Sequence, residues 1–248
     1  MVVHGTKQMR NILVKSLFEI VDTNWHIKDR AAEKDLFAKY VEMHQISLGS
    51  FTKHLKGDWE FKFLSGRVGK VNDAFKKTFL GIYDLWQQGN TNIFYTDPDT
   101  IAVQDINPWN ISDKFMMFNY TDPRSFTKSN RYGRKFENFF NAGVRLFPAQ
   151  MKQQIWDQAL RMVDDWDHDT YDTEQIILNS MLWDQKINLE DVLRPAWAYQ
   201  AQWLPDQAAV WQQDLWNGLD INQSSIIHVH SSRGIDVKLS FMKQLANR

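Results

Sequence analysis

Cysteine is absent from the 248 residues of this chain, so disulfides and thiolate metal sites are excluded and only nitrogen and oxygen can ligate a metal. Long hydrophobic runs are also absent. No stretch approaches the roughly 18 apolar residues of a membrane span, and Met1–Leu17 lacks the apolar core of a signal peptide. The net charge of −1 gives the whole molecule no strong attraction for polyanions. We therefore expect a cytoplasmic protein without a membrane span.

The residues that are present suffice for a sizeable core. Hydrophobic residues make up 43% of the chain and charged residues 24%, which is ordinary globular usage. The eleven Trp and sixteen Phe either fill this core or offer surfaces on which sugars or bases stack. No linker or repeat divides the sequence, so we expect one domain over residues 1–248.

Strand-like and helix-like segments alternate along the chain, which predicts an α/β fold with a mixed central sheet flanked by helices. We expect strands at 11–21, 59–64, 92–96, 101–103, 114–119, 142–147 and 225–230. We expect helices at 29–44, 71–88, 148–165, 173–184 and 236–245, with Gly66 and Gly69 breaking the chain before the second of these.

The acidic turn Asp97-Pro98-Asp99 follows a short apolar strand. Two carboxylates at a strand end can face one cation, and hard oxygen ligands suit Mg²⁺ or Mn²⁺. An isolated Asp-x-Asp is more often a solvated turn or a helix cap. Here apolar residues on both sides place the turn at the rim of a buried sheet, where a divalent cation could bind.

Three further stretches carry polar groups in informative places. Asn141 and Gly143 enter an apolar strand, where a glycine marks close approach of ligand or backbone, or simply a bulge. Asp172, Glu174 and Gln175 open a helix, where acidic residues are also favoured for structural reasons. His228 and His230 share one face of a late strand and could contact metal or phosphate. The nearby Arg233 and Lys238 add phosphate-binding chemistry.

Taken in order, the stretches NTNIFYTDPDTIAV, FFNAGVRLF, DTEQIILN and SSIIHVH resemble the nucleotide-diphospho-sugar transferases of the GT-A fold, especially the galactosyltransferase and glycogenin-like group. The resemblance covers roughly Val71–Lys238. It implies a metal-dependent glycosyltransferase that uses Mn²⁺ or Mg²⁺ and a nucleotide-sugar donor. Residues 1–110 would form the nucleotide-sugar-binding half and residues 111–248 the acceptor half.

The same resemblance implies a role for each matching residue. Asp97 and Asp99 would bind cation and nucleotide, with His228 or His230 as the third protein ligand. Glu174 and Gln175, in the helix that Asp172 begins, would lie with it in the catalytic part of the site, beside the anomeric carbon. The family more often has Asp where Glu174 stands. Asn141 and Gly143 would line the sugar and acceptor pocket, and Arg233 or Lys238 would contact the diphosphate.

Two other functions remain open at this point. Two-metal nucleases and phosphotransferases also use Asp-x-Asp, and Asp105, Asp113 and Asp122 could supply further acids. A non-catalytic carbohydrate- or nucleic-acid-binding module would explain the aromatic content. The basic segment Thr121–Arg134 predicts a loop that favours an anionic acceptor, such as an acidic saccharide or, second, nucleic acid.

Overall fold

The computed structural model describes residues 8–21, 35–108, 114–118, 141–164, 173–184, 198–201, 215–216, 219–220, 224–229 and 235–247. The strands are β1 (Arg10–Ile20), β2 (Glu60–Val68), β3 (Thr91–Thr96), β4 (Thr100–Ala102), β5 (Met116–Phe118), β6 (Asn141–Phe147), β7 (Ala198–Ala201), β8 (Leu215–Trp216), β9 (Leu219–Asp220) and β10 (Ile226–Val229). The helices are α1 (Leu36–His54), α2 (Val71–Trp86), α3 (Gln153–Asp164), α4 (Thr173–Asp184) and α6 (Ile235–Ala246). None of the described helices is both long and apolar enough to cross a membrane.

The main sheet has five strands in the order β2-β1-β3-β6-β5. β1 is parallel to β2 and β3, whereas β6 is antiparallel to both β3 and β5. The pairing of β1 with β3 stops at Val14 and Tyr95, so β1 continues beyond the end of β3. The expected mixed sheet is therefore confirmed. At its carboxyl end β3 stops while the neighbouring strand β1 continues.

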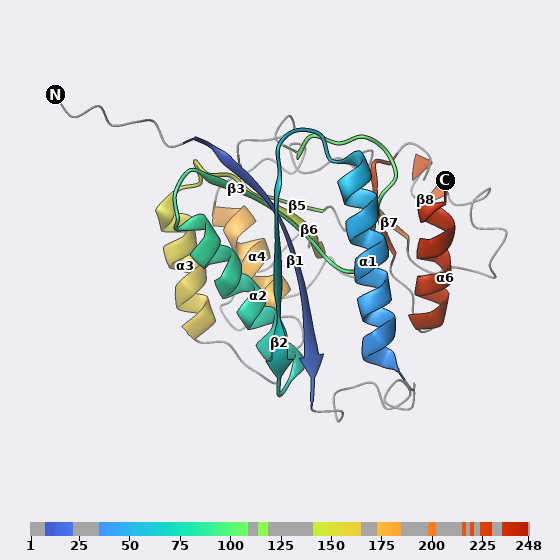
Figure 1. Ribbon diagram of the computed structural model, residues 1–248. Coiled ribbons are helices and arrows are strands. Elements are labelled where there is room, and N and C mark those ends of the chain that lie inside the picture. Colours follow the sequence, from blue (N-terminus) through green and yellow to red (C-terminus); the bar gives the residue numbers. More distant parts are fainter. Residues whose placement is uncertain are drawn as a thin grey trace.

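Helices cover both faces of this sheet: α2, α3 and α4 lie on one side and α1 on the other (Figure 1). The alternation of side chains along β1 explains the two layers. Ile12 and Val14 pack into a core that includes Trp156 of α3. Leu13 points the other way, into a core with Phe51 of α1. One strand thus contributes to two separate hydrophobic layers.

A second sheet of three strands, in the order β4-β10-β7, was not expected from the sequence. β10 is antiparallel to β4, which sets His228 opposite Thr100, one residue after the acidic turn. A third core joins this sheet to α1 and α6 through Met43, Ile227 and Met242. The late strand and the last described helix are thereby fixed next to the end of β3.

Two local expectations were wrong. Residues 29–34 of the helix expected at 29–44 lie outside the described residues. The described helix runs from Leu36, after Asp35 in a left-handed conformation (φ 64°), and extends beyond the expected end to His54. Polar residues beyond His44 interrupt the apolar pattern from which the end of the helix was predicted. Two of them, Ser47 and Ser50, are nevertheless buried, because they form hydrogen bonds with β4. Gly66 does not break the chain, because it lies inside β2, which continues to Val68.

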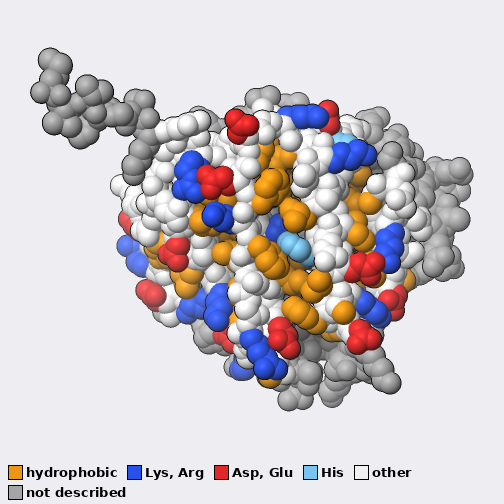
Figure 2. Space-filling view, viewed as in Figure 1, with side chains coloured by type: hydrophobic (Ala, Val, Ile, Leu, Met, Phe, Trp, Pro, Cys, Tyr) orange, Lys and Arg blue, Asp and Glu red, His pale blue; other side chains and the backbone are white. Residues whose placement is uncertain are grey.

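The edge strand β2 exposes apolar side chains. Phe61 and Phe63 are 45% and 50% exposed on the side that β1 shares through Leu13, which is the side of α1. Hydrophobic side chains form a band down the middle of the surface that Figure 2 draws, viewed as in Figure 1. The ring of Phe63 lies 4.3 Å from that of His44, so α1 contacts this side chain. Because Phe63 is still half exposed, α1 covers only part of the strand.

Candidate metal and substrate site

The acidic turn is held by backbone hydrogen bonds at both ends. The Asp97 N–H donates to the carbonyl of Gly143 at 2.8 Å, which extends the β3–β6 pairing by one residue. The carbonyl of Asp97 then accepts the N–H of Thr100 at 3.2 Å and its hydroxyl at 2.6 Å. Both carboxylates therefore sit on a defined turn at the carboxyl end of β3, as the sequence predicted.

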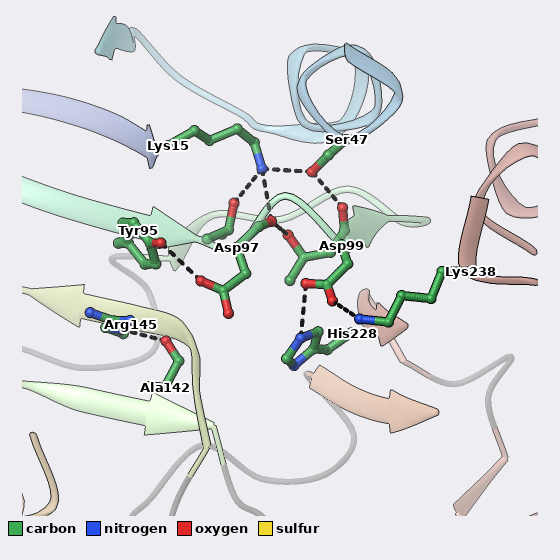
Figure 3. Close-up of polar contacts among 11 residues, drawn as sticks. Lys15, Ser47, Tyr95, Asp97, Asp99, Ala142, Arg145, His228 and Lys238 are labelled. Atoms are coloured by element: carbon green, nitrogen blue, oxygen red, sulfur yellow. Dashed lines mark hydrogen bonds and ion pairs between the residues drawn. The ribbon is translucent and has the colours of Figure 1, made fainter. Parts of the chain in front are cut away.

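Asp99 is 9% exposed and receives two side chains from distant parts of the chain (Figure 3). His228 Nε2 lies 3.0 Å from Oδ1, and Lys238 Nζ lies 2.5 Å from Oδ2. Burial alone would raise the pKa of Asp99, but the charges and hydrogen bonds of Lys238 and His228 outweigh it. They hold this pKa well below its usual value, so Asp99 is an anion at neutral pH.

Asp97 has different surroundings. Its Oδ1 accepts the hydroxyl of Tyr95 at 2.8 Å, and this hydroxyl is also 2.9 Å from Ser16 Oγ. Burial raises the pKa of Asp97 and the Asp99 carboxylate raises it further, while Arg145, His228 and the Tyr95 hydrogen bond oppose the shift only in part. Asp97 therefore takes up a proton more readily than an ordinary aspartate.

A buried lysine supports the turn from the α1 side. Lys15 Nζ on β1 donates to Ser47 Oγ at 2.6 Å, to Thr96 Oγ1 at 2.7 Å and to the carbonyl of Asp97 at 3.3 Å. Burial lowers the pKa of Lys15 to about 7, although Asp97 and Asp99 act in the opposite direction. Lys15 was not predicted as a site residue from the sequence. The one indication is that a charged residue stands within an apolar strand.

A buried ion pair lies on the opposite side of the sheet. Arg145 Nη1 of β6 is 2.7 Å from Glu174 Oε1 of α4, and the side chains are 1% and 6% exposed. The guanidinium also lies 4.3 Å from the ring centre of Tyr95, and its Nε donates to the carbonyl of Ala142. Burial raises the pKa of Glu174 to about 7, with Arg145 opposing and Asp97 adding to the rise. Arg145 was also missed from the sequence.

The other expected residues are placed less completely. Gly143 contributes its carbonyl to Asp97, and Asn141 begins β6 opposite Phe118. Gln175 is partly buried, and its carbonyl accepts the side chain of Asn179. Their roles toward a substrate stay predictions. Outside the described residues lie Asp172, His230, Arg233 and the basic segment Thr121–Arg134.

The turn and the late strand form a donor set that fits a divalent cation. One ligand atom each from Asp97, Asp99 and His228 lies within 4.8 Å of the others. Two carboxylates and an imidazole are the nitrogen and oxygen ligands that Mn²⁺ and Mg²⁺ accept, at distances of about 2.0–2.2 Å. Two carboxylates side by side, of which Asp99 is held as an anion, also favour a cation there.

No protein-family model matches the chain, and a search of curated proteins finds no match. Solved structures do match. A glycosyltransferase involved in the glycosylation of the major capsid of PBCV-1 aligns with a TM-score of 0.51 at 9% identity, over 95% of this chain and 99% of that chain. At this identity the match shows the fold alone, which is the GT-A fold that the sequence motifs predicted.

Two further structures are similar at lower TM-scores. The galactosyltransferase LgtC, in complex with donor and acceptor sugar analogs, has a TM-score of 0.48 and 14% identity over 95% of both chains. The glycosyltransferase GlyE of Streptococcus pneumoniae TIGR4 has a TM-score of 0.49 and 13% identity over 97% of this chain. The present chain spans only 63% of the length of GlyE.

Proposed function

We propose that the chain is a metal-dependent glycosyltransferase, which moves a sugar from a nucleoside-diphosphate sugar to a hydroxyl acceptor. One observation carries the proposal: the acidic turn and His228 converge within 4.8 Å at the carboxyl end of β3, in a fold shared with glycosyltransferases. Ligands of open α/β sheets bind at the carboxyl ends of the strands. The convergence therefore lies where such a fold binds its substrate.

Asp97, Asp99 and His228 would hold the cation, which supplies Lewis-acid stabilisation of the charge that develops on the diphosphate. Transfer requires that the acceptor oxygen bonds to the anomeric carbon while the bond from this carbon to the diphosphate oxygen breaks. The acceptor hydroxyl loses its proton in the same process. The protein's task is thus to orient two substrates and to balance the negative charge of the leaving group.

Several described residues could contribute to this orientation and to this charge balance. Lys15 and Ser47 fix the backbone of the turn through buried hydrogen bonds, so the carboxylates are oriented before a substrate binds. Lys238 places an ammonium group at the turn. Glu174, with a pKa of about 7, can hold or release a proton near Asp97 at neutral pH. We assign Glu174 to the sugar side of the pocket, together with Gln175 and Asn141.

A donor-hydrolysis assay tests the proposal. Purified protein is incubated with a panel of nucleotide-sugars, with Mn²⁺ or with EDTA, and free sugar is measured. We expect slow, metal-dependent hydrolysis of one donor and a loss of at least about 100-fold in Asp99→Asn, the scale of removing one key electrostatic group. Asp105→Asn, which changes an exposed acid on the same chain, is the matched control. Hydrolysis that persists unchanged in EDTA would remove the cation from the mechanism.

Binding gives a second readout that is independent of turnover. A donor present at 100 times its dissociation constant should stabilise the fold by about 2.7 kcal/mol. A thermal-shift screen with Mn²⁺ therefore identifies the base and the sugar together. If no nucleotide-sugar shifts the unfolding temperature, the proposal fails.

The two-metal alternative receives no support from the described residues. Asp105 is exposed and pairs with His54 and Lys56, away from the turn, while Asp113 and Asp122 lie outside the described residues. The anionic acceptor remains a proposal that rests on the basic composition of Thr121–Arg134. Replacing Arg124, Lys128, Arg131 and Arg134 by Ser should weaken acceptor use and its salt dependence without abolishing donor hydrolysis.

A further inference from the structure

Both oxygens of the Asp99 carboxylate are already engaged. Oδ1 contacts His228 and Oδ2 contacts Lys238, and all three side chains are at most 12% exposed. A divalent cation bound by Asp97, Asp99 and His228 would bring a second positive centre to the oxygen that the lysine now contacts. An ammonium group and a dication repel each other strongly when little water separates them.

We propose that Lys238 and the divalent cation are alternative partners of Asp99, so that cation binding displaces the lysine from this carboxylate. The inference rests on the proposed function, since it assumes the cation site of Asp97, Asp99 and His228. In the cation-free protein the ammonium group neutralises Asp99 in place of the metal. Once displaced, the same group is available to an anionic part of the donor, which arrives with the cation.

The helix that carries Lys238 is held in place, so the proposed exchange would move the side chain alone. α6 is tied to α1 by ion pairs on either side of this residue: Lys39 to Asp236 at 2.8 Å and Lys243 to Glu42 at 2.6 Å. Met242 and Leu239 of α6 also pack into the core that α1 shares with β10. With the helix fixed, exchange at Asp99 requires only rotation of the flexible four-carbon stem of the lysine.

The second partner of Asp99 is fixed. His228 pairs with Thr100 in the β4–β10 ladder, and the next residue, Val229, donates its N–H to the carbonyl of Asp99 at 2.8 Å. These backbone bonds keep His228 beside the turn, and its short side chain is 4% exposed. Of the two groups on this carboxylate, we assign the short imidazole to the cation as a ligand and the long lysine side chain to the exchange.

The exchange predicts that removing the lysine charge strengthens cation binding. Mn²⁺ affinity is measured by isothermal titration on the full chain, without nucleotide-sugar, for the wild type and Lys238→Met. We expect the dissociation constant to fall at least about tenfold in the variant. Lys243→Met is the matched control, because it removes a lysine from the same helix at an exposed ion pair and should leave the constant unchanged.

Two more variants separate exchange from a purely structural role. Lys238→Arg keeps the charge and should bind Mn²⁺ no more tightly than the wild type, whereas Lys238→Gln should resemble the methionine variant and replaces it if that variant does not fold. Unchanged or weaker Mn²⁺ binding in the neutral variants overturns the exchange, as does the absence of binding in all of them. Tighter binding without any donor hydrolysis would instead refute only the proposed transferase activity.

Discussion

Asp97 and Asp99 stand two residues apart, yet their surroundings shift their pKa values in opposite directions. Burial acts on both carboxylates and favours the neutral form. At Asp99, Lys238 and His228 reverse this effect, because they place positive charge and hydrogen-bond donors directly on the carboxylate. Asp97 instead receives a hydrogen bond from the neutral hydroxyl of Tyr95, and its pKa stays raised.

The residues that control the charge of each carboxylate come from different parts of the chain. Asp99 is held as an anion by residues more than 120 positions away in the sequence, whereas Asp97 depends on a neighbour in its own strand. Burial and the Asp99 carboxylate raise the pKa of Asp97, so Asp97 is the more readily protonated of the two carboxylates.

The largest expected effect comes from exchanging the two carboxylates for amides. Asp99→Asn removes an anionic partner of the buried Lys238 ammonium group and should lower the free energy of unfolding by about 3 kcal/mol. Asp97→Asn resembles the protonated form and can still accept the Tyr95 hydroxyl, so its cost should stay within about 1 kcal/mol. Urea unfolding of both variants at pH 7, without metal, measures the difference. Equal losses would contradict the distinction between the two carboxylates.

The next effect concerns Lys15, which donates to the carbonyl of Asp97 in the acidic turn. Its pKa is about 7 in the folded protein and 10.5 in its ordinary state, so the unfolded chain binds more protons between these values. The free energy of unfolding should therefore rise with pH from about 7 upward, by at most about 1.4 kcal/mol per pH unit from this group. Below pH 7 both states carry the proton and the contribution is constant.

Denaturant unfolding at pH 7, 8 and 9 for the wild type and Lys15→Met checks this sign. Other titrating groups cancel in the difference between the two proteins. We expect the wild type to gain relative to the variant as the pH rises. Parallel curves would show that the lysine titrates alike in both states and keeps its charge in the folded protein.

The smallest effect is expected at Tyr95. Tyr95→Phe removes the hydroxyl that joins Ser16 to Asp97 and leaves the ring against the Arg145 guanidinium. The loss of a buried hydrogen bond should cost about 1 kcal/mol, and the pKa of Asp97 should rise further. Thermal unfolding gives the first quantity, and Mn²⁺ affinity measured as a function of pH gives the second. An unchanged pH dependence would mean that the phenol does not control this carboxylate.

The sequence predicted the parts of the site that local patterns define. The apolar strand ending in Asp97-Pro98-Asp99 was placed correctly, because an unbroken buried strand and a proline turn are readable from neighbouring residues. The helix at 173–184 was also placed correctly. His228 was one of two candidates, since its strand was recognised but the contact with Asp99 spans 129 positions.

The missed residues share one physical cause. Lys15 and Arg145 are 1% exposed and lie in the middle of apolar strands, where a charged residue normally argues against full burial. Each is buried because strands and helices distant in sequence supply its partners: Ser47 and Thr96 for the lysine, Glu174 for the arginine. Such compensation exists only in the folded chain. A charged residue interrupting an apolar strand is nevertheless a usable signal for a polar group buried near a site.

The long sequence separation within the site also governs when it can form during synthesis. Asp99 is translated 139 residues before Lys238 and 129 residues before His228. Until those residues leave the ribosome and α6 docks on α1, the Asp99 carboxylate of the acidic turn lacks these two basic partners. A nascent chain can therefore build the β1–β3 part of the sheet early, but its cation site is completed only by the late strand and helix. Folding of this region is consequently limited by long-range contacts, which form slowly.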